Sequence, residues 1–120
     1  MANDCEVHEM IYKTLGKTGL KVSILGYGAS PLGNEFGTAD PEEGKRAVHY
    51  AIERGVNYFD VSPYYGRTLA ETRLGEALRG RRDEVLLATK AGRYDKAVSY
   101  THLTLPTNVQ QCRSRWSPDH

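Results

Sequence analysis

Three residues in the middle of the chain have the types needed to move a proton to or from a carbonyl oxygen: Asp60, Tyr65 and Lys90. An unperturbed phenol has a pKa of about 10 and is a poor proton donor at neutral pH. A neighbouring lysine ammonium stabilises the phenolate, and a carboxylate keeps that lysine charged and oriented. A tyrosine beside a lysine–aspartate pair therefore predicts proton transfer coupled to hydride transfer at a carbonyl.

Each of these residues also has an ordinary structural interpretation when it is taken alone. Asp60 could cap a loop, Tyr65 could pack half-buried, and Lys90 could be a surface lysine at the end of a strand. Their combination favours a site, because all three fall at or just after the ends of predicted strands. The carboxyl ends of parallel strands meet on one face of an α/β barrel, so the three side chains are expected to converge there.

The elements that must position these residues follow from the hydrophobic pattern. Residues 12–25 predict a hairpin whose turn contains Gly16 and Gly19, and residues 24–29 predict a buried strand. A helix is predicted from Pro41, with Asp40 as its N-cap, up to residue 55. A second helix is predicted to open with a capping box at residues 68–71. Short strands are predicted at residues 56–60 and 84–90.

Alternating strands and helices indicate a parallel sheet with helical crossovers. Doubly wound sheets and (β/α)8 barrels both begin in this way, so the pattern alone leaves both folds open. The dinucleotide-binding loop of a doubly wound sheet is disfavoured: Gly26 and Gly28 begin the pattern, but Pro31 stands where the third glycine is needed. No helix is predicted directly after this loop either.

The motifs together resemble the aldo-keto reductases, and most closely the L-galactose dehydrogenase-like branch of that family. The resemblance rests on GVNYFDVSPYYG at residues 55–66, followed by Glu71 and by Leu74 and Gly75. It is also carried by LGYGASPLG at residues 25–33 and by ATKAGRY at residues 88–94. It covers roughly residues 11–95, and the motifs in combination are specific.

The resemblance implies the N-terminal portion of a (β/α)8 barrel, truncated, with the hairpin closing its base. It implies an oxidoreductase that uses NAD or NADP on a small-molecule carbonyl or sugar, with Asp60, Tyr65 and Lys90 at three of the family's four catalytic positions. It places Gly28, Ala29 and Ser30, together with Asp60, beside the nicotinamide. The family's main cofactor-binding loops belong to the last part of the barrel, beyond the matching residues.

Two departures from the family pattern concern the site. Val61 stands where the family usually has threonine or serine, which is expected to remove a hydroxyl near the site. The family's fourth catalytic residue is a histidine at the end of the next strand, but His102 follows Lys90 by only twelve residues. A crossover helix alone needs about 10–12 residues, so His102 is too close. His8 and His49 are misplaced as well.

The character of the sequence changes near residue 97, and we expect a domain part at 11–95 and a separate segment at 97–120. This segment has no Lys, no Gly and one acid, Asp119, and all twelve glycines of the chain precede it. It resembles tails produced when sequencing-adapter DNA is translated in frame, with a divergent native extension as the alternative. We therefore expect the 120-residue chain to be an inactive fragment.

Composition excludes some classes of partner. The formal net charge is +1, which argues against a nucleic-acid-binding protein, and no segment is long and apolar enough to suggest a membrane span. Cys5 and Cys112 have no metal or disulfide spacing, so no metal site and a cytoplasmic location are expected. The alternatives to an enzyme are a non-catalytic binding or regulatory subunit and a truncated product without function. The oligomeric state stays open.

Overall fold

The computed structural model describes residues 9–92. The predicted segment 97–120, His8, His102, Cys5 and Cys112 lie outside the described residues. The described chain begins with an antiparallel hairpin of β1 (Tyr12–Thr14) and β2 (Lys21–Ser23), as predicted. None of the helices in residues 9–92 is long and apolar enough to cross a membrane.

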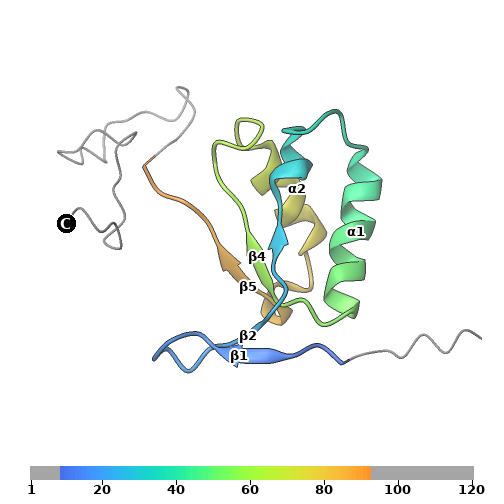
Figure 1. Cartoon of the computed structure of the whole chain (residues 1–120). Helices are drawn as coiled ribbons and strands as arrows, with labels where there is room; N and C mark the ends of the chain where they lie inside the picture. Colours follow the sequence, from blue (N-terminus) through green and yellow to red (C-terminus); the bar gives the residue numbers. More distant parts are fainter. Residues whose placement is uncertain (1–8, 93–120) are drawn as a thin grey trace, which may run out of the picture.

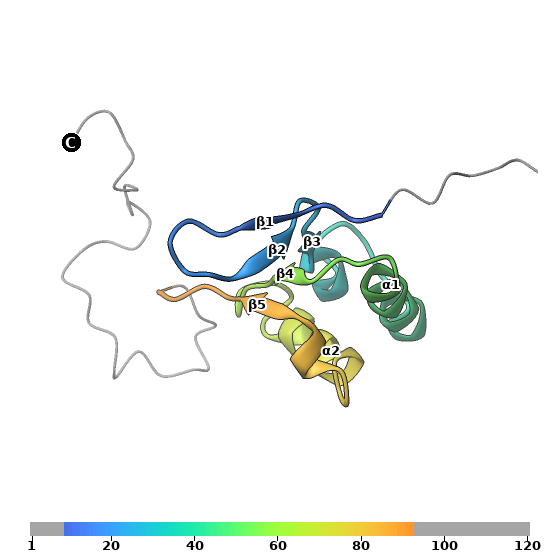
Figure 2. The same cartoon turned by 90° about the horizontal axis from the view of Figure 1, so that it is seen from below.

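A parallel sheet of three short strands follows the hairpin, in the order β3-β4-β5. The strands are β3 (Tyr27–Gly28), β4 (Tyr58–Asp60) and β5 (Leu86–Ala88). Helices α1 (Pro41–Glu53) and α2 (Leu69–Ala77) form the crossovers, and both lie on the same side of the sheet, while the hairpin crosses its lower end (Figures 1 and 2). Short 3₁₀ turns, η1 (Ser30–Gly33) and η2 (Arg82–Glu84), follow β3 and precede β5.

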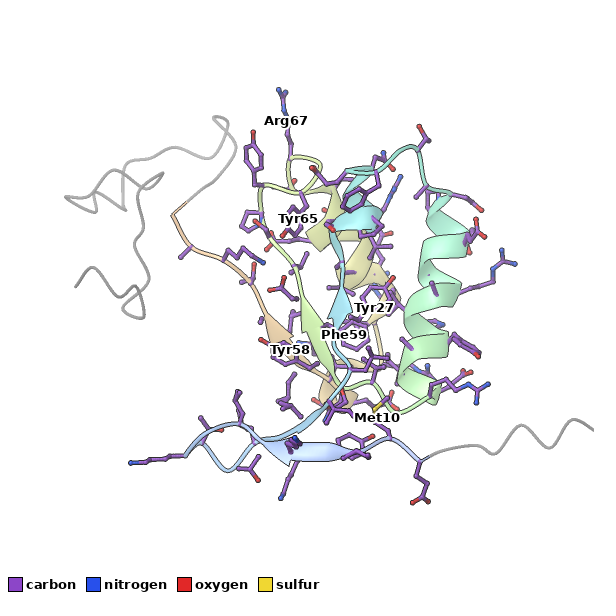
Figure 3. The ribbon with its side chains drawn as sticks, in the orientation of Figure 1. Met10, Tyr27, Tyr58, Phe59, Tyr65 and Arg67 are labelled. Carbon is purple, nitrogen blue, oxygen red and sulfur yellow. The ribbon has the colours of Figure 1, made fainter. Side chains whose placement is uncertain are left out.

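The core lies between the sheet and the two helices. Phe59 of β4 is completely buried, and its ring stacks on Tyr27 of β3 with the ring centroids 5.0 Å apart. Figure 3 shows the two side chains next to each other. The helices contribute small and aliphatic side chains to this layer, which allows them to lie close to the sheet. The buried apolar residues are Ala29, Leu32, Val48, Val56, Phe59, Val61, Ala70, Leu74, Ala77, Leu78 and Val85.

The start of α1 confirms its sequence-based prediction. The Asp40 side chain accepts a hydrogen bond from the Glu42 amide at 3.3 Å, and Pro41 occupies the first turn. The predicted capping box of α2 is wrong, because Thr68 has a left-handed φ of 75° and its side chain makes no capping hydrogen bond. The tight turn before α2 forces this conformation on Thr68, and Glu71 instead accepts a hydrogen bond from Thr89.

The prediction of a continuous buried strand at residues 24–29 is also wrong. Strand β3 contains only Tyr27 and Gly28, and the side chains of Ile24 and Leu25 are 57% and 61% exposed. The chain bends after the hairpin, and the Ser23 hydroxyl closes this bend by donating to the Leu25 carbonyl at 2.7 Å. The bend turns the chain from the hairpin into the parallel sheet.

One asparagine joins the hairpin to the sheet. The Asn57 side chain accepts a hydrogen bond from the Ser23 amide at 2.7 Å and donates to the Lys21 carbonyl at 2.9 Å. The Asn57 amide donates to the Ser23 hydroxyl at 3.1 Å. These bonds hold β2 at the start of β4.

Replacing Asn57 with alanine is expected to lower the free energy of unfolding by about 1–3 kcal/mol, because it removes the partner of the partly buried Ser23 amide and of the more exposed Lys21 carbonyl. Urea unfolding of the 120-residue chain measures this loss. Asn57→Asp keeps an acceptor for Ser23 but loses the donor to Lys21, so an intermediate loss is expected. Unfolding curves of Asn57→Ala that coincide with wild type would contradict this function of the side chain.

Candidate active site

The structure brings the three predicted catalytic residues together at the carboxyl end of the parallel strands. Asp60 is the last residue of β4, Lys90 follows β5 by two residues, and Tyr65 lies in the loop between β4 and α2. The Lys90 ammonium is 2.8 and 2.7 Å from the two carboxylate oxygens of Asp60 and 5.2 Å from the centre of the Tyr65 ring. Figure 3 shows Tyr65 at the opposite end of the strands from Met10 and the hairpin.

Strand register explains why Asp60 and Lys90 meet. Asp60 pairs with Gly28 on one side and with Ala88 on the other, so its side chain lies between two residues that leave space around it. The parallel pairing of β4 and β5 then carries the chain past Ala88, and Lys90 reaches back to Asp60. Lys90 also donates to the Val61 carbonyl at 3.2 Å, so three oxygen atoms hold its ammonium.

The electrostatics of the pair favour a charged lysine. Partial burial disfavours the ammonium, but the hydrogen bonds and negative charge of Asp60, with a smaller contribution from Tyr65, raise the pKa of Lys90 overall. The Asp60 and Lys90 side chains are 42% and 45% exposed, so the site is open to solvent and to a small molecule. At neutral pH the tyrosine ring therefore lies next to a positive charge that is fixed in position.

This raised pKa predicts how the stability of the chain depends on pH. A lysine whose pKa is higher in the folded state stabilises that state fully below its ordinary value of 10.5, and loses this contribution as the pH rises through the folded pKa. The difference in unfolding free energy between wild type and Lys90→Met is therefore expected to decrease from pH 9 to strongly alkaline pH. The change is small because the pair is exposed.

Urea unfolding of both proteins across this pH range measures the difference and cancels the titration of other groups. Lys45→Met is the matched control, since Lys45 lies on α1, away from the site. A difference between wild type and Lys90→Met that grows with pH would contradict the predicted direction.

Backbone hydrogen bonds hold the loop that carries Tyr65. The Tyr65 amide donates to the Ser62 carbonyl at 3.1 Å, and the Tyr65 carbonyl accepts from the Ala70 amide at 3.2 Å. The Ser62 side chain is buried and accepts from the Tyr64 amide at 3.2 Å. Tyr65 is half-buried and packs against the core, so its ring has a defined place beside Lys90.

The predicted nicotinamide contacts have different environments. Gly28 is exposed and adjacent to Asp60, and a Cβ added there would meet no atom within 4 Å. Ser30 is half-buried at the start of η1. Ala29 is completely buried, and its amide donates to the Asp60 carbonyl at 2.8 Å. Open surface for a flat ring therefore lies at Gly28 and Ser30, with Ala29 supporting it from below.

The departures from the family pattern have structural explanations. The Val61 side chain is buried in the core, and the group that Val61 presents to Lys90 is its carbonyl oxygen, which any residue supplies. His49 lies between the helices, where its Nε2 is 2.7 Å from the Ala77 carbonyl oxygen. Within residues 9–92 no histidine therefore joins the cluster of Asp60, Tyr65 and Lys90.

One contact near the site was missed by the sequence reasoning. The Thr89 hydroxyl donates to the Glu71 carboxylate at 2.7 Å and so links the segment before Lys90 to the first turn of α2. The spacing of Glu71 from Thr68 also fits a capping box, so the sequence alone predicts that role for Glu71. The polar character of the residue before Lys90 was the available signal.

Three parallel strands with helical crossovers carry a lysine–aspartate–tyrosine cluster at their carboxyl ends, an arrangement that fits the opening part of an α/β barrel. A family model described as "Aldo/keto reductase family" matches residues 24–119. The chain belongs to the aldo/keto reductase family, and its fold is the N-terminal portion of the family's (β/α)8 barrel.

Two relatives support this assignment. The chain is 39% identical over 111 residues to L-galactose dehydrogenase of Arabidopsis thaliana, a match that covers 90% of this chain and 35% of that protein. It is 38% identical over 109 residues to a probable voltage-gated potassium channel subunit beta of the same plant, covering 83% of this chain and 32% of the relative. This chain therefore spans about a third of the length of these relatives.

A solved structure gives the same result. An aldo-keto reductase from Bacillus halodurans, in its holo form, superimposes with a TM-score of 0.64 at 38% sequence identity. The superposition covers 72% of this chain and 28% of the Bacillus protein. It decides between the two folds that the order of strands and helices had left open, in favour of the barrel.

Proposed function

We propose that this chain is the N-terminal part of an oxidoreductase that transfers a hydride between NAD or NADP and the carbonyl of an aldehyde or aldose. The observation that carries the proposal is the Lys90 ammonium, which contacts both Asp60 oxygens and lies over the Tyr65 ring. This arrangement supplies a proton donor beside a fixed positive charge, which carbonyl reduction requires.

Tyr65 is the acid and base of the proposed reaction. In the reducing direction its hydroxyl donates a proton to the carbonyl oxygen, and in the oxidising direction the phenolate accepts a proton from the sugar hydroxyl. Lys90 stabilises the phenolate that forms, and Asp60 keeps Lys90 charged and directed toward the site. A bound nicotinamide would supply or accept the hydride.

The residues present fit a nicotinamide ring at the end of β3. Gly28 offers open space beside Asp60, Ser30 offers a hydroxyl, and Ala29 fixes the backbone beneath them. We assign these residues and Asp60 to the nicotinamide end of the cofactor. The rest of the cofactor is assigned to barrel loops that follow the described residues.

An aldose is the substrate class that the relatives favour. The Arabidopsis relative is named for L-galactose, and the proposed site has the exposure that a hydroxylated small molecule requires. Oxidation of an aldose at its anomeric carbon uses the same proton transfer in reverse, from the sugar hydroxyl to the Tyr65 phenolate.

A completed barrel tests this proposal. In this chimera, residues 11–92 of the chain replace the matching N-terminal segment of the Arabidopsis L-galactose dehydrogenase. We expect nicotinamide-dependent oxidation of L-galactose by the chimera. We expect no turnover by the 120-residue chain alone above that of its own Tyr65→Phe variant, because the loops assigned to the cofactor are missing from residues 9–92. Turnover by the chain alone above this control would contradict the second expectation.

A non-catalytic subunit is the second candidate, and the similarity to the channel subunit favours it. A subunit of this kind keeps the barrel and binds the cofactor without needing fast chemistry. The completed barrel separates the candidates: cofactor binding with no turnover on any of a panel of aldoses and aldehydes supports the subunit, and turnover that depends on Tyr65 supports the enzyme.

A further inference from the structure

The loop that follows β3, residues 29–35, is the first loop of the parallel sheet, and it touches the backbone of Tyr65 directly. A Cβ built on Gly33 would lie 2.7 Å from the carbonyl carbon and oxygen of Tyr65 and 2.9 Å from the Gly66 nitrogen. A Cβ built on Gly66 would likewise clash with the Gly33 carbonyl oxygen. Glycine at both positions therefore allows η1 and the Tyr65 loop to pack backbone against backbone.

Hydrogen bonds of two side chains, Glu35 and Arg73, stabilise this contact. The Glu35 carboxylate accepts a hydrogen bond from the Gly66 amide at 2.8 Å, directly after Tyr65. Arg73 of α2 donates to the Leu32 carbonyl at 2.8 Å and to the Asn34 side chain at 3.1 Å. The first loop is thus bonded to the tyrosine loop through Glu35 and to α2 through Arg73.

The two loops carry the two halves of the proposed chemistry. Turn η1 begins at Ser30, one of the residues assigned to the nicotinamide, and ends at Gly33, against Tyr65. Leu32 and Gly33 are buried within η1, so the turn has little freedom to move. A rigid turn between these points fixes the spacing between hydride donor and proton donor.

We propose that the Gly33–Gly66 contact, with Glu35, is the positioning element that places Tyr65 against Lys90 and relative to the first loop. The inference rests on the proposed function, since it treats Tyr65 as the proton donor. The position of the Tyr65 ring can be tested without measuring turnover, because the Lys90 ammonium lies over that ring.

Ring currents give the direct measurement. The 120-residue chain is labelled with ¹³C at the lysine ε position, and the Lys90 signal is assigned with Lys90→Arg. In wild type the Lys90 ε protons are expected upfield of their position in Tyr65→Leu, which removes the ring. In Gly33→Ala we expect the signal to move most of the way to the Tyr65→Leu position, because the added Cβ displaces the tyrosine loop.

Gly75→Ala is the matched control. Gly75 lies in α2, and a Cβ there would meet nothing within 4 Å, so the Lys90 signal is expected to stay at its wild-type position. A folded Gly33→Ala chain with a wild-type Lys90 signal would overturn the proposal. A wild-type signal that coincides with Tyr65→Leu would overturn the placement of Tyr65 itself.

A second pair of variants decides the matter if Gly33→Ala does not fold. Glu35→Gln keeps an oxygen acceptor for the Gly66 amide, whereas Glu35→Ala removes it. We expect Glu35→Ala to move the Lys90 signal and Glu35→Gln to restore it, and equal signals in the two variants would overturn the proposal. The proposed function is judged separately by turnover of the completed barrel, so either idea can fail without the other.

Discussion

Replacing Tyr65 with phenylalanine in the completed barrel is expected to lower kcat by about 10²–10⁴-fold, the usual contribution of a positioned acid or base. The substitution removes one oxygen atom and keeps the ring that packs against the core and lies over Lys90. KM for the sugar is expected to change little, since the hydroxyl acts mainly in the transition state. Steady-state kinetics with a saturating nicotinamide cofactor measure both constants.

Tyr64→Phe is the matched control for this prediction. It removes the same hydroxyl oxygen one residue earlier, from a side chain to which the proposed reaction assigns no role. We expect kcat within a few-fold of that of the completed barrel. Equal losses in Tyr64→Phe and Tyr65→Phe would show that the hydroxyl of Tyr65 has no special function.

Replacing Phe59 with alanine is expected to lower the free energy of unfolding by about 3–5 kcal/mol. Phe59 is completely buried in the middle strand of the sheet, and its ring stacks on Tyr27, so truncation removes apolar burial and leaves a cavity. Single domains are stable by about 5–15 kcal/mol in total, so the variant is expected to unfold at much lower urea concentration. Circular dichroism during urea unfolding of the 120-residue chain measures the shift.

Leu87→Ala serves as the comparison for this core substitution. Leu87 is the register partner of Phe59 on β5 but is 38% exposed at the edge of the described sheet. Less burial is lost, so the cost is expected to be well below that of Phe59→Ala. A larger loss at Leu87 than at Phe59 would contradict the position of the core between the sheet and the helices.

The sequence predicts the elements that follow from local chemistry. Asp40 and Pro41 define the start of α1 because a cap and a fixed φ act within a few residues. Asp60 at the end of β4 is predicted because a short run of strand-favouring residues ends in a carboxylate. The convergence of Asp60, Tyr65 and Lys90 is predicted because parallel strands present their carboxyl ends on one face.

Features that depend on the backbone conformation of turns and bends, or on contacts between separate segments, were not predictable in the same way. Thr68 does not cap α2 because the preceding turn places it in a left-handed conformation, and Glu71 instead accepts a hydrogen bond from the Thr89 hydroxyl. Ile24 and Leu25 read as buried strand residues, but the bend closed by Ser23 leaves them exposed. The packing of Gly33 on Gly66 joins two loops that no local pattern connects.

The central claim is that Asp60, Lys90 and Tyr65 act as one catalytic unit, and a mutant cycle in the completed barrel tests it most directly. The measurement is kcat for Tyr65→Phe, for Lys90→Met and for the double variant, since residues that act together lose activity non-additively. We predict that the double variant is about as slow as Tyr65→Phe alone, because Lys90 acts through the tyrosine. Losses that multiply in the double variant would contradict the claim.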